Sequence, residues 1–352
     1  MLHKCDVLVI GAGPAGATAA KSAAEAGAKT ILMEKRKQVG VPVQCAEYVP
    51  HQMTQEVKLP EEVIAQRIDC MRTHMPDGEV VETAVRGFMI HRDFFDQHLA
   101  DEAAKAGAGL LEAEAKEYKG GTVFALTKAG PLEIEAKLVV GADGPHSTAG
   151  KWINAQNKEF IQTAQHQMPL VSESKSTEVY FRKDIPVGYG WVFPKGKRAN
   201  VGVGVNVQFG ESPLKALRHF EGYLQQEGVI GNEVIKTIGG AIPVGGLVNR
   251  LYFGNVLLVG DAAGMAHPIT GAGVSNAVLC GKMAGEIAGR AALEGDLGLL
   301  AEYEEECRLL LGHPLTRAWQ KRKQIEASWR ETEEEWLPAI RLSWIAFEDY
   351  WR

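Results

Sequence analysis

The sequence has few of the features that mark a metal-binding, nucleic-acid-binding or membrane-spanning protein. Its five cysteines form no CxxC pair and show no metal-ligand spacing, so we expect no metal site. The formal net charge of -6 gives no electrostatic case for binding nucleic acid. No run of about 18 uncharged apolar residues could cross a bilayer. We therefore expect a cytoplasmic protein in a reducing compartment, membrane-associated at most by peripheral contact.

Its composition is otherwise ordinary for a globular protein of two domains. The 352 residues are 45% hydrophobic and 23% charged, which allows an ample core. The apolar N-terminus has the composition of a signal peptide, but cleavage would remove the first glycine turn described below, so we expect none. The sequence holds no internal repeat and no low-complexity segment. The informative features are short motifs, and three of them are centred on glycine.

The first glycine motif follows an apolar run at residues 7–10. It consists of Gly11, Ala12, Gly13, Pro14, Ala15 and Gly16. An alanine-rich stretch and a second apolar run ending in Glu34 complete the pattern strand, turn, helix, strand, acid. Gly11 permits the tight turn, Gly13 lets a pyrophosphate approach, and Gly16 lets the helix close onto the strand. Glu34 would accept hydrogen bonds from ribose hydroxyls and repel a 2′-phosphate, which favours FAD or NAD over NADP.

Two further apolar runs end in glycine turns that carry an aspartate. The residues concerned are Asp143 and Gly144 in one turn, and Gly260 and Asp261 in the other, with a glycine-rich helix start at Gly271, Ala272, Gly273 and Val274. Either turn alone is typical of any strand end. Together with the first motif, they would bring carboxylates and backbone amides to the carboxyl ends of several strands of one sheet, where ligands of doubly wound folds bind. The sequence therefore predicts an FAD site.

The three motifs, in this order, resemble those of the FAD oxidoreductases built like p-hydroxybenzoate hydroxylase, over most of residues 1–290. Within that superfamily, residues 189–204 look like the YxWxFPx7-8GxG signature of the geranylgeranyl reductase family. The matching residues are Tyr189, Trp191, Phe193, Pro194, Gly202 and Gly204. The resemblance implies reduction of prenyl double bonds by reduced FAD, with electrons from an external donor such as NAD(P)H or a ferredoxin-like carrier.

The resemblance also assigns individual residues. Cys45 matches a cysteine that faces the isoalloxazine in geranylgeranyl reductases, although Ala46 stands where a glycine is expected. A protonated thiol there could place a proton near the alkene while flavin N5 delivers hydride; a buried, inert cysteine is the alternative. Arg92 resembles an arginine at a helix start that contacts FAD, with a surface charge as its alternative. Lys35, beside the ribose-binding acid, is assigned to the cofactor as well.

The order of segments predicts an α/β fold with a Rossmann-like FAD-binding domain of the GR2 type, an interleaved substrate domain on an antiparallel sheet, and a C-terminal helical segment. We expect the FAD-binding domain to comprise residues 1–65, 88–161 and 246–295. We expect the substrate domain to comprise residues 66–87 and 162–245, and the C-terminal helical segment to comprise residues 296–352. Among the expected elements is a single strand at 109–117.

Aromatic residues gather in two places. Tyr189, Trp191 and Phe193 alternate along an expected strand and should form one apolar wall for a prenyl chain, unless they simply pack on the core. Five of the seven tryptophans lie in the last 34 residues. There, Leu337, Ile340, Trp344, Phe347 and Trp351 fall at helical spacing on one face. That face could pack on the core, dock on a membrane or cover the lipid site, or form a dimer contact.

Three other functions compete with prenyl reduction. An aromatic hydroxylase that uses flavin hydroperoxide would need the same FAD motifs, but residues 189–204 argue against it. A flavin-dependent halogenase has a similar WxWxIP strand, but usually a third consecutive glycine in its first motif. A non-enzymatic protein with a degenerate nucleotide fold is disfavoured because Glu34, Asp143 and Asp261 are all retained.

Overall fold

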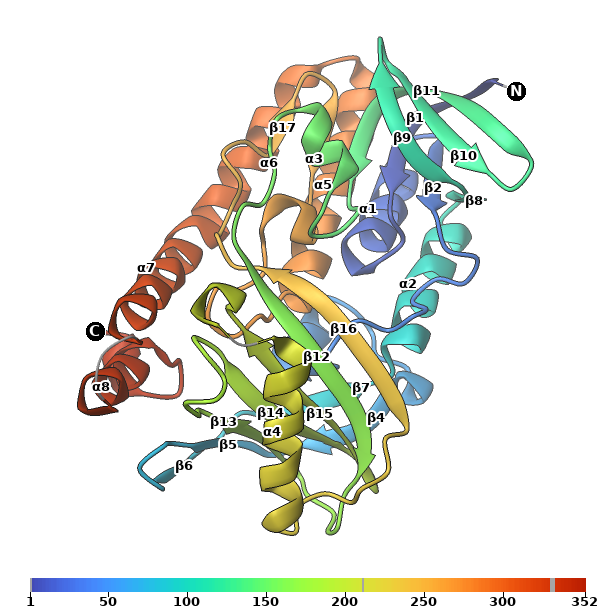
Figure 1. The fold of residues 1–352 in the computed structure, drawn as a ribbon. Helices are drawn as coiled ribbons and strands as arrows, with labels where there is room; N and C mark the ends of the chain where they lie inside the picture. Colours follow the sequence, from blue (N-terminus) through green and yellow to red (C-terminus); the bar gives the residue numbers. More distant parts are fainter. Residues whose placement is uncertain (1, 211, 330–332) are drawn as a thin grey trace.

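The computed structural model describes residues 2–210, 212–329 and 333–352. It contains two large sheets, and the first lies above the second in the view of Figure 1. The first sheet has the order β17-β18-β11-β1-β2-β8, with β9 and β10 added beside β11. Its strands are β1 (Leu2–Ile10), β2 (Thr30–Glu34), β8 (Gly109–Glu112), β9 (Glu114–Lys119), β10 (Thr122–Thr127), β11 (Gly130–Gly141), β17 (Tyr252–Phe253) and β18 (Val256–Leu258). The central strands β8, β2, β1, β11 and β18 are parallel. This is the expected nucleotide-binding core, and the α/β fold class is confirmed.

Helix packing around this sheet depends on small residues. The helices are α1 (Pro14–Glu25), α2 (Arg92–Lys105), α3 (Thr148–Trp152) and α5 (Val274–Glu294). A side chain at Gly281 would lie 2.5 Å from the Ala15 carbonyl oxygen, and one at Gly285 would lie 2.2 Å from that of Ala19. Glycine at every fourth residue of α5 therefore lets its backbone rest directly on the alanine-rich helix α1. The contact fixes both helix starts beside the same sheet edge.

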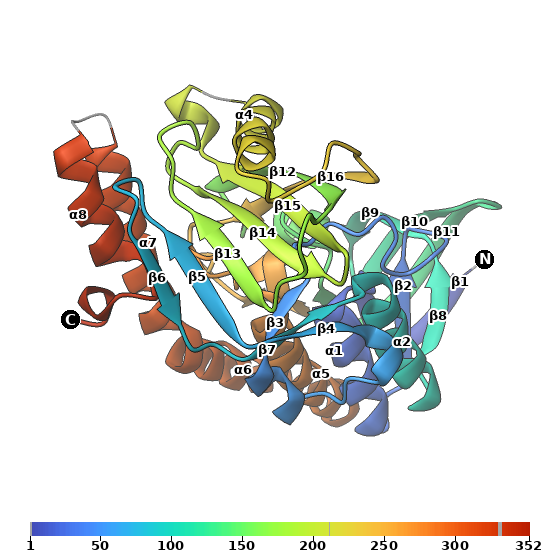
Figure 2. The same ribbon diagram turned by 90° about the horizontal axis from the view of Figure 1, so that it is seen from below.

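The second sheet has the order β16-β12-β15-β14-β13-β5-β6 and is antiparallel except where β13 meets β5. Its strands are β5 (Cys70–His74), β6 (Val80–Thr83), β12 (Phe160–Pro169), β13 (Ser176–Tyr180), β14 (Tyr189–Lys195), β15 (Arg198–Val205) and β16 (Lys236–Pro243). Helix α4 (Pro213–Gln226) covers one face with Leu217, Phe220 and Leu224 (Figure 2). The nucleotide domain and the C-terminal helices lie on the side of the opposite face.

A small third sheet connects the two. It consists of β3 (Tyr48–Pro50), β7 (Gly87–Ile90) and β4 (Ile64–Ile68), with β7 in the middle. The chain enters β7 from the β5–β6 hairpin and leaves it into α2. The first nucleotide-binding segment therefore reaches the second sheet before the chain returns to the first.

The C-terminal helices run from the first sheet to the edge of the second (Figures 1 and 2). They are α6 (Leu300–Cys307), a π-helical turn (Arg308–Gly312), α7 (His313–Ser328) and α8 (Glu333–Ser343). Trp336, Ile340 and Trp344 are buried in one cluster with Val179 of β13 and with Phe181, which directly follows that strand. Within the described residues, no helix has the length and apolar character needed to cross a membrane.

Two expectations about elements were wrong. The strand expected at 109–117 is two strands, because Ala113 bonds to the Glu34 carbonyl and the chain then leaves β2 to pair with β10. The helix expected to carry Trp351 ends earlier, at Ser343. Beyond that residue the chain turns, and the Trp351 side chain is 62% exposed. The hydrophobic spacing past residue 343 therefore reflects packing of a turn against the sheet, and core packing explains the rest of the face.

Candidate flavin site

The three glycine motifs meet in space. A side chain at Gly11 would lie 2.4 Å from the carbonyl oxygen of Ala142, which precedes Asp143. A side chain at Gly260 would lie 2.8 Å from Cβ of Ala15. Both glycines also have positive φ angles, of 100° and 67°. Only residues without a Cβ allow these three turns to lie in contact, which places their backbone amides around one space.

The first turn is open for phosphate. Helix α1 begins after Gly13 with no side-chain cap, so its first amides are not satisfied by the protein's side chains. A Cβ built on Gly13 meets no atom within 4 Å. Glu34 ends β2 beside this turn, where its carboxylate accepts from the amides of Ala12 at 2.9 Å and Arg36 at 3.0 Å. Lys35 is exposed. The arrangement matches a pyrophosphate at a helix start with a ribose acceptor alongside.

Charged groups from three motifs share the adjoining space. Arg92 forms two hydrogen bonds of 2.9 Å to the Asp96 carboxylate one turn further along α2, so it is no surface charge. Burial raises the pKa of the Asp96 carboxyl although Arg92 opposes the shift, and the negative charge of Glu34 raises it further. Burial also raises the pKa of Asp261, again opposed by Arg92. Glu34, Arg92 and Asp261 thus belong to one electrostatic cluster.

Asp143 has a different set of partners. Its carboxylate accepts from Ser147 Oγ at 2.5 Å and from the amides of Thr148 at 2.6 Å and Ala149 at 3.1 Å. It therefore caps the start of α3. Gly144 follows it at a φ of 84°. The side chain of Asp143 shapes the turn, and contact between this turn and the cofactor remains a prediction.

The start of α5 supplies the second uncapped helix end. Gly271 has a φ of 67°, and Gly273 precedes Val274 with no side-chain cap. A Cβ built on Gly273 would lie 3.4 Å from Asp261 Oδ1, so this helix start faces the same cluster. Ala272 accepts at its carbonyl from the amide of His267 at 2.8 Å. Free amides at this end can stabilise negative charge on a bound group.

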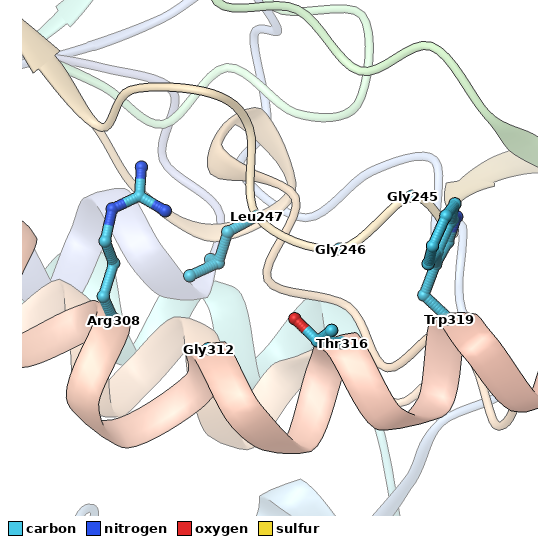
Figure 3. A pocket seen from close by; sticks show the side chains of 7 residues that line it. All are labelled: Gly245, Gly246, Leu247, Arg308, Gly312, Thr316 and Trp319. Atoms are coloured by element: carbon cyan, nitrogen blue, oxygen red, sulfur yellow. The ribbon is translucent and has the colours of Figure 1, made fainter.

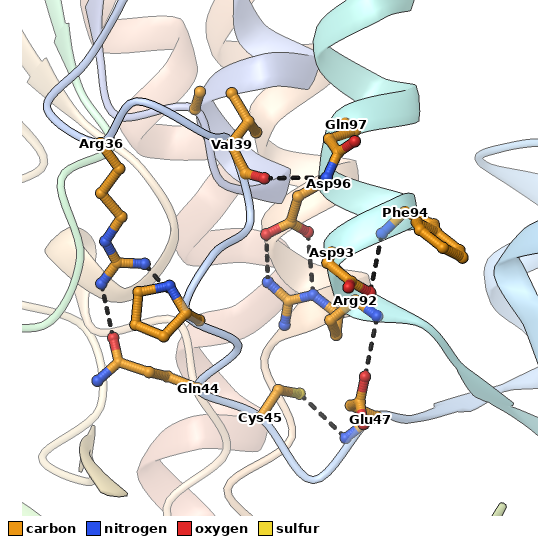
Figure 4. Close-up of polar contacts among 12 residues, drawn as sticks. Arg36, Val39, Gln44, Cys45, Glu47, Arg92, Asp93, Phe94, Asp96 and Gln97 are labelled. Carbon is orange, nitrogen blue, oxygen red and sulfur yellow. Dashed lines mark hydrogen bonds and ion pairs between the residues drawn. The ribbon is translucent and has the colours of Figure 1, made fainter. Parts of the chain in front are cut away.

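The Cys45 loop passes beside the start of α2, where Arg92 lies (Figure 4). The half-buried Cys45 sulfur accepts from the Glu47 amide at 3.2 Å. Burial alone would lower the pKa of the Arg92 guanidinium, but Asp96 and the neighbouring Cys45 sulfur raise it above its ordinary value. Glu47 Oε1 accepts from the Arg92 amide at 3.0 Å. The thiol is therefore held beside the charged cluster, and Ala46 fits the loop where glycine was expected.

The aromatic residues of β14 lie on the face of the second sheet that looks toward this loop. The ring centroids of Tyr189 and Trp191 are 5.9 Å apart, and those of Trp191 and Phe193 are 6.4 Å apart. Trp191 Nε1 donates to Gln165 Oε1 at 2.8 Å, and Gln165 Nε2 donates to the Cys45 carbonyl at 3.3 Å. The aromatic row and the Cys45 loop are thus joined by one glutamine.

Part of this row is core, and its most buried member is Trp191, which is 6% exposed. Tyr189 donates to the Thr270 carbonyl at 2.5 Å and packs against Trp344, with centroids 5.3 Å apart. Phe193, at the other end, is half-buried beside Tyr48. The strand continues past Phe193 through Pro194, and its partner strand carries Gly202 opposite Trp191 and Gly204 opposite Tyr189. The Trp191–Phe193 end is the part that lies nearest the Cys45 loop.

Four polar residues of this region were missed by sequence reasoning: Glu47, Gln165, Lys195 and Asn200. Glu47 and Lys195 form an ion pair of 2.7 Å whose side chains are 5% and 8% exposed. The sequence offered two signals: Lys195 directly follows the apolar signature, and Glu47 lies two residues after Cys45. Neither signal pairs residue 47 with residue 195.

Two cavities lie elsewhere. One of about 120 Å³ separates the loop at Gly245, Gly246 and Leu247 from the helix that carries Thr316 and Trp319 (Figure 3). Another of about 480 Å³ is lined by residues including Lys58, Arg67 and Phe88. Neither is lined by the glycine motifs or by the Cys45 loop. No cluster of metal-ligating side chains occurs among the residues that the structure describes.

The residues present fit FAD. The nucleotide and the flavin ring would be held by the uncapped helix starts of α1 and α5, by the acid that ends β2, and by the glycine turns. A Cβ at these glycines would force the turns apart. When bound, the flavin can supply a hydride to a substrate beside it. The chain brings a thiol, a paired arginine and an aromatic strand together around the Cys45 loop.

Comparisons with known proteins agree with this assignment. A family model described as geranylgeranyl reductase catalytic domain matches residues 159–242, FAD dependent oxidoreductase matches 6–142, and lycopene cyclase protein matches 211–336. The chain is 37% identical over 349 residues to the digeranylgeranylglycerophospholipid reductase of Methanocella arvoryzae, covering 92% of this chain and 88% of that protein.

Solved structures give the same result. A geranylgeranyl bacteriochlorophyll reductase-like protein from Thermoplasma acidophilum superposes with a TM-score of 0.85 at 26% identity, covering 98% of this chain and 97% of that one. Aklavinone-11 hydroxylase in complex with FAD and aklavinone shares the fold, with a TM-score of 0.73 at 19% identity over 96% of this chain and 70% of that one. The chain belongs to the geranylgeranyl reductase family of FAD-dependent oxidoreductases.

Proposed function

We propose that the protein saturates carbon–carbon double bonds in the geranylgeranyl-type chains of a membrane lipid. The observation that carries this proposal is the position of the Cys45 loop between the Arg92 cluster and the aromatic strand β14. The similar protein of Methanocella arvoryzae is named for a glycerophospholipid that carries such chains, and we propose the same substrate class here. A hydroxylase or halogenase would use the same flavin motifs, but the relatives carry a reductase name.

The side chains have distinct roles in this proposal. Trp191 and Phe193 contact the prenyl chain, since burial of each CH2-sized group contributes about 0.8 kcal/mol. The thiol of Cys45 gives its proton to the alkene carbon that does not receive the hydride, and solvent restores that proton afterwards. Arg92, paired with Asp96, holds the loop and the thiol in place through its amide bond to Glu47 and its guanidinium beside the Cys45 sulfur. The net result is addition of one hydride and one proton across the double bond.

The electron donor and the membrane contact belong to the same proposal. We infer that NAD(P)H or a ferredoxin-like carrier reduces the flavin in a transient complex, because the sequence holds one dinucleotide fingerprint. We also infer a cytoplasmic enzyme that touches the bilayer peripherally to reach its substrate, with exposed Trp351 and Leu342 as candidate contacts near the C-terminus.

Single-turnover reoxidation tests the proposal. The protein is reduced anaerobically and mixed with a digeranylgeranyl glycerophospholipid, with its fully saturated analogue, or with aromatic acids plus oxygen. We expect flavin absorbance to return with the unsaturated lipid alone, and mass spectrometry to find two added hydrogens per double bond. Reoxidation coupled to hydroxylation of an aromatic acid would overturn the proposal.

A further inference from the structure

The loop that carries Cys45 is tied to the second sheet at four consecutive residues. The bonds are Gln44 Nε2 to the Gly239 carbonyl at 3.0 Å, Gln165 Nε2 to the Cys45 carbonyl at 3.3 Å, Asn200 Nδ2 to the Ala46 carbonyl at 3.1 Å, and Lys195 Nζ to Glu47 Oε2 at 2.7 Å. They reach β16, β12, β15 and β14. A loop of the nucleotide domain is thus held across the face that carries the aromatic row.

Glu47 is the centre of this attachment. Its carboxylate accepts from three different elements: the Arg92 amide at the start of α2 at 3.0 Å, Lys195 of β14 at 2.7 Å, and Asn200 of β15 at 2.8 Å. Only 4% of the Glu47 surface is exposed. One buried acid therefore joins the helix that carries Arg92 to the two strands that carry the family signature.

Stability does not account for this arrangement. Glu47 has a φ of 72°, in the left-handed region that is unfavourable for a non-glycine residue. A buried ion pair contributes little to stability beyond what apolar residues of similar volume would, because both charges lose their hydration. A strained residue that carries a buried charge is typical of a site where geometry matters more than stability.

The same residue fixes the thiol directly. The Glu47 amide donates to the Cys45 sulfur at 3.2 Å, two residues back along the same loop. With that lone pair occupied, the sulfur cannot rotate freely, and its S–H bond must point away from the Glu47 amide. The orientation of the thiol therefore depends on the conformation that the Glu47 carboxylate holds in place.

We propose that Glu47, through its ion pair with Lys195 and its bond to Asn200, is a positioning residue that fixes the Cys45 thiol against the substrate-binding face. The inference rests on the proposed role of Cys45. It predicts that loss of the Glu47 charge loosens the loop and misplaces the thiol, without removing any group that contacts FAD through the glycine motifs.

The test uses the holoenzyme with Glu47→Gln and, as a second variant, Lys195→Met. Glu178→Gln is the matched control, since Glu178 is a buried acid of the same sheet whose carboxylate bonds to His74, 2.6 Å away, and to Ser176. It lies opposite Val192, which packs with the residues of α4 on the other face of the sheet from the loop. Two readouts are compared: the rate at which iodoacetamide labels Cys45, with half-buried Cys70 as internal reference, and the single-turnover reoxidation of reduced flavin by the unsaturated lipid.

For both loop variants we expect faster labelling of Cys45 relative to Cys70, unchanged FAD affinity, and reoxidation slowed by about a hundredfold, the effect of a misplacement near 1 Å. The control should label and react like the wild type. Wild-type labelling and reoxidation in both loop variants would overturn the inference. If labelling accelerates while Cys45→Ser turns over normally, the positioning of the loop stands and the catalytic role of Cys45 is lost instead.

Discussion

Trp191 and Gly202 lie opposite each other on β14 and β15, and the indole ring occupies the space that a side chain at residue 202 would need. A Cβ built on Gly202 would lie 2.3 Å from the Trp191 ring. Gly204, the other glycine of the signature, faces Ile161, where a Cβ would lie 3.0 Å away. The absence of side chains at the glycines of the family signature therefore leaves the space that its tryptophan ring occupies.

This relationship predicts the effect of Gly202→Ala. The added methyl group must displace the indole, and overpacking of this kind costs about 1–3 kcal/mol. We expect a lower Tm and weaker alkene reduction, measured by calorimetry and by lipid-dependent flavin reoxidation. Gly222→Ala is the control, because a Cβ at this position of α4 meets no atom within 4 Å and alanine favours the helix. Equal stability of the two variants would contradict the packing argument.

A second prediction concerns the ring itself. Trp191→Ala removes apolar contact area and should weaken lipid binding at least about tenfold, at ~0.8 kcal/mol per CH2-sized group of lost contact. Trp191→Phe keeps much of that area and loses the bond to Gln165. We therefore expect lipid affinity close to wild type for Trp191→Phe, with slower reoxidation because Gln165 also binds the Cys45 carbonyl. Fluorescence quenching by the lipid gives the affinities. An unaffected affinity in Trp191→Ala would mean a purely structural strand.

Much of the fold and the cofactor site could be predicted because the structural reason for a glycine is often found within a few residues of it in the sequence. Gly16 must be glycine because a Cβ there would lie 1.8 Å from the carbonyl oxygen of Gly11, five residues earlier, so the need for it can be read from a short stretch of sequence. The pair of Glu47 and Lys195 is different. Residues 148 positions apart become partners only when the chain has crossed from one sheet to the other, and no spacing records that.

The partners of the Asp143 carboxylate could not be predicted either, because its capping role depends on where α3 begins. Contact between this turn and the cofactor stays a prediction. The error about the helix expected to carry Trp351 has a different cause. The apolar spacing looks helical because the turn after Ser343 buries Trp344 and Phe347, three residues apart, whereas Trp351, the next residue of the pattern, is exposed. A period alone does not distinguish these two cases.

A third prediction tests the thiol. Cys45→Ser retains an acceptor for the Glu47 amide but replaces the thiol with a hydroxyl, a far weaker acid, so reoxidation by the lipid should slow by about a hundredfold or more. FAD content should stay the same, measured from the flavin absorbance of the purified protein. Cys70→Ser, on β5, serves as control. Unchanged turnover in Cys45→Ser would remove this residue from the mechanism.

A fourth prediction concerns pH. Burial lowers the pKa of His267 to about 4, from an ordinary 6.5. Its Nδ1 accepts from the amides of Ile269 and Thr270, which a protonated ring could not allow. The unfolded chain binds this proton between pH 6.5 and 4 and the folded protein does not, so the stabilising contribution is complete above pH 6.5 and is lost as the pH falls toward 4. The loss amounts to about 3 kcal/mol.

His267→Asn should remove that part of the pH dependence, because an amide oxygen can accept the same bonds without titrating. Chemical unfolding between pH 4 and 7 measures it, with exposed His219→Asn as the control. We expect the free energy of unfolding to vary less with pH in His267→Asn than in the control. Identical pH profiles would show that His267 is protonated in the folded state as readily as in the unfolded chain.

The last prediction separates the roles of two C-terminal tryptophans. Trp344 is 2% exposed, donates from Nε1 to Thr73 Oγ1 at 3.1 Å and packs on Phe181, so Trp344→Ala should cost about 3–5 kcal/mol. Trp351 is 62% exposed, and Trp351→Ala should change stability by less than about 0.5 kcal/mol. If the C-terminus touches the bilayer, Trp351→Ala should instead reduce sedimentation with lipid vesicles. A stable Trp344→Ala would mean that the segment does not belong to the core, whereas loss of vesicle binding in Trp351→Ala alone would assign the membrane contact to the exposed ring.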